Sequence, residues 1–123
     1  MIGYITLGTN DLEKYGKFYD ELLAIIGATR FMADDHIILW GTKPGQAMFS
    51  LITPNDGKAA TVGNGTMAAF KVDNLDIIKQ LHTKSIELGG TDEGEPGPRG
   101  ETLDFGYVRD LEGNKLAFFC TKT

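Results

Sequence analysis

The feature that most constrains the fold of this chain is an internal repeat. Residues 5–28, ITLGTNDLEKYGKFYDELLAIIGA, match residues 68–91, AAFKVDNLDIIKQLHTKSIELGGT, without a gap. Each copy begins with alternating residues, as a half-buried strand does, and continues with apolar residues at helical spacing. Asp11 and Asn74 stand at equivalent positions and are residues that favour helix N-termini. The repeat predicts two copies of one strand–helix unit; the alternative is two unrelated helices in a generic α+β domain.

Strand-like segments follow each predicted helix. The first helix is expected to end at Gly27 and the second at Gly89-Gly90, because glycine readily adopts the left-handed conformation. The later strands are predicted at 36–40 (HIILW), 47–53 (AMFSLIT), 103–109 (LDFGYVR) and 115–121 (KLAFFCT), with a short one around 29–32. Residues 91–100, TDEGEPGPRG, are predicted to be a loop, which could be a mobile flap over a binding site.

These elements predict an α+β fold of two tandem βαβββ modules, whose curved mixed sheets surround a central cleft. One domain, 1–123, is expected to contain module one at about 1–53, a polar connector at 54–65, and module two at about 66–123. The length of 123 residues suits a single domain with one real core.

The charge and composition of the chain exclude several classes of binding partner. The net charge is −5, and Lys and Arg are not clustered, so neither nucleic acid nor an anionic membrane surface is an expected partner. No apolar run approaches the roughly 20 residues of a membrane-spanning helix. A single cysteine, Cys120, excludes an intrachain disulfide. We therefore expect a cytoplasmic protein.

At this point the sequence resembles the vicinal oxygen chelate superfamily, the glyoxalase, bleomycin-resistance and extradiol-dioxygenase group. Three segments carry the resemblance: LGTNDLEKYGKFYDELL, GTMAAFKVDNLD and the closing hairpin YVRDLEGNKLAFF. The resemblance implies paired βαβββ modules around a cleft, in agreement with the repeat. It also implies that the protein is a homodimer.

Enzymes of that family hold a divalent metal in the cleft through His, Gln or Glu, one on each of four strands. The resemblance places Tyr4, Ser50, Met67 and Ala117 at those positions. Tyrosine with its usual pKa near ~10 is a poor ligand, methionine prefers soft metals, and alanine has no donor. We therefore expect no metal and no cofactor, which puts the metal-dependent activities of the family in doubt.

Strand alternation then selects the residues expected to bind a ligand in the cleft. With Tyr4 facing inward, Thr6 also does, and the same rule applies on the other strands. The predicted ligand-binding residues are Tyr4, Thr6, Trp40, Ser50, Met67, Arg99, Tyr107, Ala117 and Phe119. The directions of Trp40 and Tyr107 are left open, and Arg99 is the expected cationic clamp. A mostly apolar lining suits a small organic molecule, although the same side chains could simply fill the cleft as core.

Weaker candidates receive structural interpretations. His82 is expected at the surface or boundary of the second helix, and Arg109-Asp110 as a brace of the closing hairpin. No Ser/His/Asp or Cys/His set indicates nucleophilic catalysis. Three functions remain: a metal-free binding protein for a small organic molecule, a glyoxalase-like lyase or isomerase, and a non-catalytic interaction module.

Overall fold

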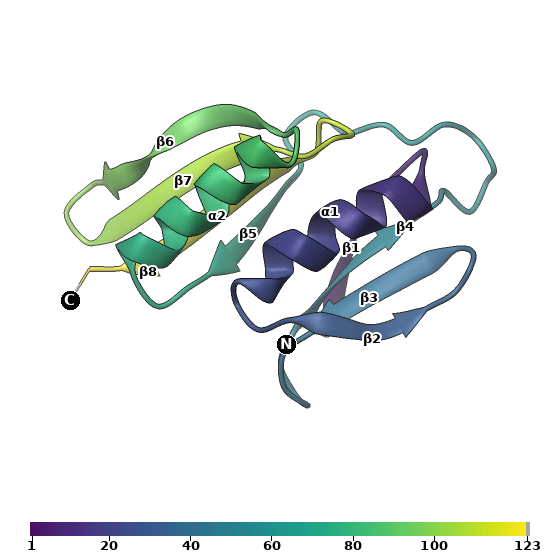
Figure 1. Ribbon diagram of the computed structural model, residues 1–123, viewed down its shortest axis with the longest axis horizontal. Coiled ribbons are helices and arrows are strands. Elements are labelled where there is room, and N and C mark those ends of the chain that lie inside the picture. The colour runs from purple at the N-terminus through teal and green to yellow at the C-terminus, as the bar shows by residue number, and fades with distance from the viewer. Residues whose placement is uncertain (123) are drawn as a thin grey trace. The chain divides into compact units, whose positions relative to one another are not determined.

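The computed structural model describes residues 1–122 (Figure 1). The chain forms two compact units, residues 1–63 and residues from 64 onward. In chain order the elements are β1 (Tyr4–Gly8), α1 (Leu12–Ala24), β2 (Thr29–Ala33), β3 (Ile37–Gly41), β4 (Met48–Ile52), β5 (Met67–Lys71), α2 (Leu75–Glu87), β6 (Thr91–Arg99), β7 (Leu103–Arg109) and β8 (Lys115–Thr121). Each unit is a βαβββ module, which confirms the predicted fold class.

The two modules share one sheet topology. The strand orders are β1-β4-β3-β2 and β5-β8-β7-β6, so each sheet has four strands. The first strand of each module pairs in parallel with the last, and the other pairs are antiparallel, which makes both sheets mixed. A shift of 63 residues superimposes β1 on β5 and α1 on α2, end to end. The repeat in the sequence is therefore a repeat of structure.

Both helices begin as the sequence predicts. A carboxylate oxygen of Asp11 accepts from the backbone N–H of Lys14 at 3.1 Å, and Oδ1 of Asn74 accepts from that of Ile77 at 3.0 Å. These caps satisfy amide groups that lack a partner within the helix. After the helices, Gly27 and Gly89 take positive φ values of 78° and 102°, as predicted for left-handed helix stops.

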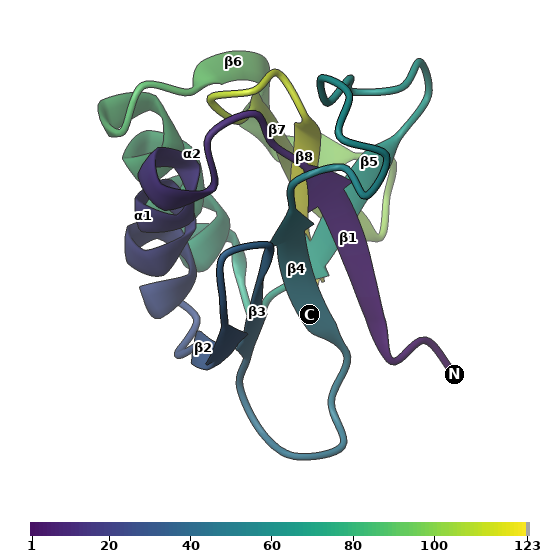
Figure 2. The same ribbon diagram turned by 90° about the vertical axis from the view of Figure 1, so that its right-hand side faces the viewer.

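In the first unit, α1 covers one face of the sheet (Figure 2). Tyr19 of α1 is fully buried, with its ring centroid 4.7 Å from that of Phe49 and 5.6 Å from that of Trp40. Phe18 meets Tyr19 edge to face at 5.1 Å. Tilted and edge-on ring pairs at these distances are favourable arrangements of aromatic side chains. The core of this unit is thus an aromatic cluster between helix and sheet.

In the second unit, the core beneath α2 is largely aliphatic. Ile78 and Leu81 of the helix and Leu116 and Phe118 of β8 are fully buried. A Cβ at Gly106 of β7 would come within 3.0 Å of the Ile78 side chain, so glycine at this position lets the helix approach the sheet. Neither helix of the described chain is long and apolar enough to cross a membrane.

The prediction of a loop at 91–100 is wrong, because Thr91–Arg99 form the edge strand β6. Pro96 and Pro98 do not prevent this, since an edge strand has one row of backbone groups with no strand to pair with. The pairing of β6 with β7 is also interrupted by two register shifts, after Asp92 and after Gly94. Proline and glycine signalled a turn in the sequence, whereas they mark an irregular edge strand.

Candidate functional site

The helix-free face of the first sheet carries hydroxyl groups between apolar side chains. Thr6 and Ser50 face each other across β1 and β4, and their hydroxyl oxygens lie 2.6 Å apart. Ser50 is fully buried and donates to the carbonyl of Ile5 at 3.1 Å, so Thr6 donates to Ser50. Tyr4 is on the same face by alternation and is 52% exposed. This face therefore combines an internally bonded hydroxyl pair with an exposed phenol.

Trp40, predicted as a ligand-binding residue, belongs to the opposite face. It pairs with Phe49 across β3 and β4, packs against Tyr19 of α1, and is only 1% exposed. Its indole N–H donates to Oδ1 of Asp20 at 2.9 Å. Directly opposite residues in an antiparallel pair project to the same face, so the register of β3 places Trp40 in the core beneath α1.

Asp20 connects Trp40 to the edge of the sheet. Its carboxylate also accepts from Nε and Nη2 of Arg30 on β2, both at 2.8 Å. Partial burial acts to raise the pKa of Asp20, but the hydrogen bonds from Arg30 and Trp40 and the Arg30 charge outweigh it, so the pKa lies below its ordinary value. This carboxylate therefore stays ionised and ties α1 to β2 and β3.

The helix-free face of the second sheet carries a row of aromatic rings. Phe119 stacks on Phe105 with centroids 5.2 Å apart, and Phe105 stacks on Tyr107 at 5.4 Å, with interplanar angles of 17° and 8°. Ala117 pairs directly with Tyr107 and lies on the same face. Three stacked rings beside a methyl group form a continuous apolar patch on this face.

Two cations flank this aromatic row. The guanidinium of Arg99 lies 5.6 Å from the Tyr107 ring centroid, and Nζ of Lys115 lies 5.2 Å from it. These distances are within the range of cation–π attraction. Arg99 is held in place because its guanidinium donates to the main-chain carbonyls of Glu95, Gly97 and Pro98.

Further basic residues lie on the same face. Strand alternation and register place Lys71 and Arg109 there, next to Phe119 and Lys115 respectively. The acid that the strands add is Glu93, whose Oε1 accepts from Nε of Arg109 at 2.8 Å. This face is therefore net positive, although the chain as a whole carries a charge of −5.

The remaining weaker candidates have structural roles or are buried. Arg109 donates to the carbonyl of Gly113 at 3.0 Å, and Asp110 accepts from the backbone N–H of Asn114 at 2.8 Å, which confirms the predicted hairpin brace. The prediction for His82 is wrong, because the residue is only 7% exposed and its Nε2 lies 2.8 Å from Asp92. Helical periodicity places position 82 on the buried stripe with Ile78, Leu81 and Ser85, but it does not indicate the partner, which lies on β6.

A polar surface pocket of about 470 Å³ opens beside the loops after β1 and β4. His36, Thr53, Asn10 and Lys58 contribute to its lining. Two of these side chains are already bonded to each other, since Thr53 Oγ1 lies 2.7 Å from His36 Nδ1. The pocket contains none of the predicted ligand-binding residues.

Several solved structures similar to this chain are glyoxalase/bleomycin resistance proteins. A glyoxalase/bleomycin resistance protein from Albidiferax ferrireducens T118 is 34% identical over 98% of both chains, with a TM-score of 0.89. The chain belongs to the glyoxalase/bleomycin resistance/dioxygenase family. This confirms the resemblance to the vicinal oxygen chelate superfamily.

More distant members of the glyoxalase/bleomycin resistance/dioxygenase family share the fold. A family enzyme from Burkholderia phytofirmans PsJN is 16% identical over 98% of both chains, with a TM-score of 0.79. A fosfomycin resistance protein from Mesorhizobium loti is 17% identical over 99% of this chain and 92% of its own, with a TM-score of 0.70. No family model and no curated protein matches the chain.

The four side chains that the resemblance places at the family's metal-ligand positions, Tyr4, Ser50, Met67 and Ala117, do not fit a divalent metal here. The Ser50 hydroxyl is buried and already engaged by Thr6 and Ile5. Ala117 is fully buried and offers no donor atom, and Met67 carries a thioether, which favours soft metals. Of the four side chains, the phenol of Tyr4 alone combines an oxygen donor with exposure. One phenol does not make a site for a hard or borderline cation.

Sequence reasoning missed Phe105, Lys71 and Lys115 as members of the second face. The signal for Phe105 was present, because strand alternation along LDFGYVR places it on the same side as Tyr107. Lys115 occupies the first position of β8, directly opposite Met67 and Arg109. Its closeness to the Tyr107 ring depends on the register between β7 and β8, which the sequence does not state.

Proposed function

We propose that this protein binds a small, flat, negatively charged organic molecule, without a metal, on the helix-free face of its second sheet. The observation that carries the proposal is the row of Phe119, Phe105 and Tyr107 with Arg99 and Lys115 beside it. An apolar plane with a few fixed polar groups is the usual chemistry of a small-molecule site.

The aromatic row and the cations have separate roles in this proposal. The stacked rings of Phe105 and Tyr107 offer an apolar patch against which the aromatic part of a ligand packs. Arg99 presents a planar guanidinium suited to a carboxylate or a related oxyanion. Because backbone carbonyls already hold this guanidinium in position, less side-chain entropy is lost when a ligand binds.

The charge distribution supports an anionic ligand. The strands place Lys71, Arg99, Arg109 and Lys115 on the face of the aromatic row, with Glu93 as their acidic neighbour. A positive surface on an acidic chain raises the local concentration of small anions and excludes cations.

The test uses 2-naphthoate and its neutral counterpart 2-naphthamide as probes, with EDTA-treated protein. We expect 2-naphthoate to raise the melting temperature and to bind saturably in calorimetry, since a ligand that binds the folded state stabilises it. 2-Naphthamide should bind at least about tenfold more weakly, because it stacks without charge. Equal affinity for both probes, or binding that requires an added divalent metal, would contradict the proposal.

Variants assign the binding to this face. Arg99→Ala and Lys115→Ala should each weaken 2-naphthoate binding several-fold and leave 2-naphthamide binding nearly unchanged. Lys79→Ala is the matched control, because Lys79 is an exposed lysine on α2. If all three variants bind 2-naphthoate like the unmodified protein, the anion does not bind at the aromatic row.

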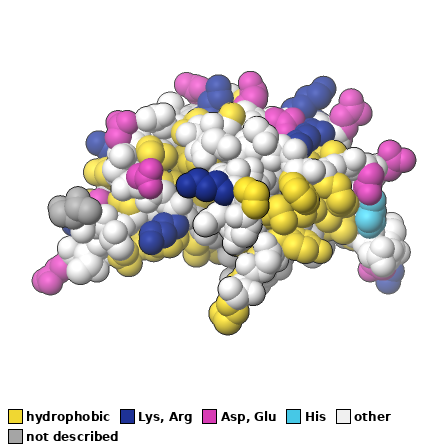
Figure 3. Space-filling view, turned by 90° about the horizontal axis from the view of Figure 1, so that it is seen from below, with side chains coloured by type: hydrophobic (Ala, Val, Ile, Leu, Met, Phe, Trp, Pro, Cys, Tyr) yellow, Lys and Arg dark blue, Asp and Glu magenta, His cyan; other side chains and the backbone are white. Residues whose placement is uncertain are grey.

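We also propose that the protein is a homodimer. Most of its exposed large apolar side chains belong to the first unit, among them Ile2, Phe31 and Met32, and Figure 3 shows apolar side chains gathered at the surface. Phe31 and Met32 lie on the edge strand β2, and exposed apolar side chains on an edge strand favour association. Light scattering after gel filtration should give twice the mass of the chain, and Phe31→Glu should give the monomer.

A further inference from the structure

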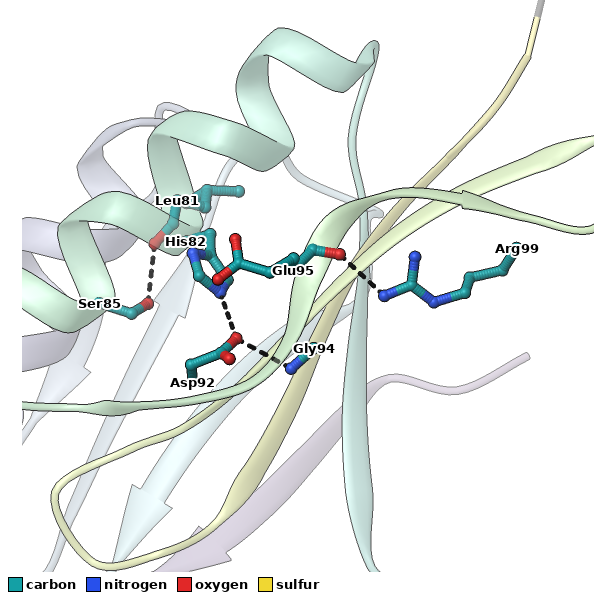
Figure 4. Close-up of polar contacts among 7 residues, drawn as sticks. All are labelled: Leu81, His82, Ser85, Asp92, Gly94, Glu95 and Arg99. Carbon is teal, nitrogen blue, oxygen red and sulfur yellow. Dashed lines mark hydrogen bonds and ion pairs between the residues drawn. The ribbon is translucent and has the colours of Figure 1, made fainter.

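Three side chains able to bind a metal ion converge where α2 meets β6. Nε2 of His82 lies 2.8 Å from Oδ1 of Asp92, and Glu95 extends its carboxylate toward the same point (Figure 4). One ligand atom from each of the three residues lies within 4.8 Å of the other two. An imidazole nitrogen and two carboxylates are thus directed at one place on the helix-covered side of the second sheet.

The irregular pairing of β6 produces this convergence. In a regular strand, residues three apart project to opposite faces, so Asp92 and Glu95 would be separated by the sheet. Asp92 pairs with Val108, which is fully buried in the core, whereas Gly94 pairs with Tyr107 on the helix-free face. The register shift between Asp92 and Gly94 returns Glu95 to the side of α2. Bulges commonly re-aim side chains in this way.

The electrostatics of the cluster favour a cation. Asp92 and Glu95 each bring a carboxylate to the cluster, and Asp92 also accepts from the backbone N–H of Gly94 at 2.9 Å. Within residues 1–122, no lysine or arginine forms an ion pair with Asp92 or Glu95. The nearby guanidinium of Arg99 donates instead to the main-chain carbonyl of Glu95 at 2.8 Å. Two carboxylates therefore meet with an imidazole as their basic neighbour.

The imidazole is positioned before any ion binds. The side chain of His82 is 9% exposed, whereas that of Asp92 is 47% exposed. The ring is thus held by packing beneath the helix, and its Nε2 faces outward to Asp92. A buried imidazole with an outward nitrogen, next to two exposed carboxylates, is open to an ion that arrives from solvent.

We propose that His82, Asp92 and Glu95 bind a divalent transition metal ion of the zinc class and thereby fasten α2 to β6. Zinc accepts one imidazole and two carboxylates at about 2.0–2.2 Å in tetrahedral geometry, with water in the fourth position. Ligand atoms in such a site are separated by about 3.4 Å. The present separations, 2.8 Å for His82–Asp92 and at most 4.8 Å within the cluster, lie on either side of that value.

This site is independent of the proposed ligand function. It uses neither the four positions that hold metal in other family members nor any residue of the aromatic row. Binding of 2-naphthoate to EDTA-treated protein can fail while zinc binds here, and the reverse can also occur. The two proposals therefore stand or fall separately.

The test is calorimetric titration of ZnCl₂ into EDTA-treated, dialysed full-length protein at neutral pH. We expect saturable binding of one ion per chain and a higher melting temperature with zinc. Asp92→Asn and Glu95→Gln should each weaken zinc binding by at least about tenfold and reduce the thermal shift. Cobalt(II) in place of zinc should give the visible absorption of a tetrahedral nitrogen–oxygen site, which Glu95→Gln should diminish.

Two controls keep the experiment decisive. Glu93→Gln makes the same chemical change two residues away, on a side chain paired with Arg109, and His36→Asn removes the other histidine of the chain. Both should bind zinc within about twofold of the unmodified protein. Glu95 is exposed, so Glu95→Gln is expected to stay folded. The proposal is overturned by the absence of saturable binding, by unchanged affinity in Asp92→Asn and Glu95→Gln, or by lost affinity in either control.

Discussion

The two modules have the same backbone plan and different chemistry at equivalent positions. Thr6 and Ser50 form a cross-strand pair on the helix-free face of the first sheet, and Ala69 and Ala117 form the equivalent pair on the second. The first pair is two hydroxyls 2.6 Å apart, and the second is two methyl groups. Neither pair offers the carboxylate or imidazole that a divalent metal prefers. The repeated backbone thus places side chains at equivalent positions in both modules, although the chemical type of those side chains differs.

The side-chain contact between the helix and the edge strand also differs in chemistry between the two modules. In the first unit the acid is on the helix, since Asp20 of α1 pairs with Arg30 of β2 at 2.8 Å. In the second unit the acid is on the strand, since Asp92 of β6 pairs with His82 of α2 at 2.8 Å. Each module thus joins its helix to its edge strand by an acid and a basic residue, but the acid and the base exchange elements between the two modules. Only the second contact joins the carboxylate to an imidazole, which is itself able to bind a metal ion.

The largest expected effect separates the helix-covered face of a sheet from its helix-free face. Trp40→Ala should lower the free energy of unfolding by about 3–5 kcal/mol, because it removes a buried aromatic side chain from the cluster with Tyr19 and Phe49. Tyr107→Ala, on the helix-free face of the other sheet, should cost less than half as much. Urea denaturation measures both.

Trp40→Phe keeps an aromatic ring if Trp40→Ala does not fold. It should cost about 1–3 kcal/mol, from lost volume and the lost hydrogen bond to Asp20. If a Trp40 variant kept native stability and no longer bound 2-naphthoate, the assignment of Trp40 to the core beneath α1 would be wrong.

An intermediate effect is expected from exchanging the chemistry of the two equivalent pairs. Ala117→Ser places a hydroxyl at a fully buried position opposite Ala69, where a partner must be found, and should cost about 1–3 kcal/mol. Ser50→Ala removes a hydroxyl from a satisfied pair with Thr6 and should cost about 1 kcal/mol. Thermal and urea unfolding of the two variants should rank Ala117→Ser as the more destabilising.

The reverse ranking would mean that the second sheet has a ready partner for a hydroxyl at position 117. The chemistry of the two faces would then be interchangeable. Thr6→Val is the control for the first sheet, because its hydroxyl is the one that donates to Ser50, and its loss should cost no more than Ser50→Ala.

The smallest expected effect is the pH dependence of the stability that the Asp20–Arg30 ion pair contributes between α1 and β2. The pKa of Asp20 is lower in the folded state than the ordinary 3.8, so its contribution to stability is present above that pH and is lost as the pH falls through the folded-state pKa. Asp20→Asn should destabilise by about 1 kcal/mol or less at neutral pH, since the pair with Arg30 is part-exposed and screened by solvent.

The difference in melting temperature between the unmodified protein and Asp20→Asn should shrink as the pH is lowered below 3.8. Asp35→Asn, at an exposed turn position, serves as the control and should match the unmodified protein throughout. A difference that persists undiminished at lower pH would show that the ionised carboxylate of Asp20 contributes nothing through its charge.

Much of the fold was predictable because it depends on local signals. The caps at Asp11 and Asn74, the spacing of apolar residues in both helices, and the strands 103–109 and 115–121 all follow from short-range pattern. The edge strand at Thr91–Arg99 was not predictable in this way. Its glycines and prolines resemble a turn, and only the neighbouring β7 supplies the partner that makes it a strand.

The candidate site was predictable in part. Alternation places Thr6, Ser50, Ala117 and Phe119 on the helix-free faces, because the direction of a side chain in a regular strand has period two. Trp40 could not be placed, since its strand needs a register with β4 to fix a face. The cluster of His82, Asp92 and Glu95 could not be predicted from strand alternation, because a register shift in β6 changes the alternation between Asp92 and Glu95.

The sequence by itself determined two repeated strand–helix units and the chemistry of the residues in them. The repeat at an offset of 63 residues and the absence of His, Gln and Glu from positions 4, 50, 67 and 117 are both visible in the letters. The tertiary structure decided which residues meet: three rings in a row, Trp40 beneath α1, and one histidine with two acids. The physical reason is that periodicity specifies direction within an element, while strand register, bulges and helix docking specify contact between elements.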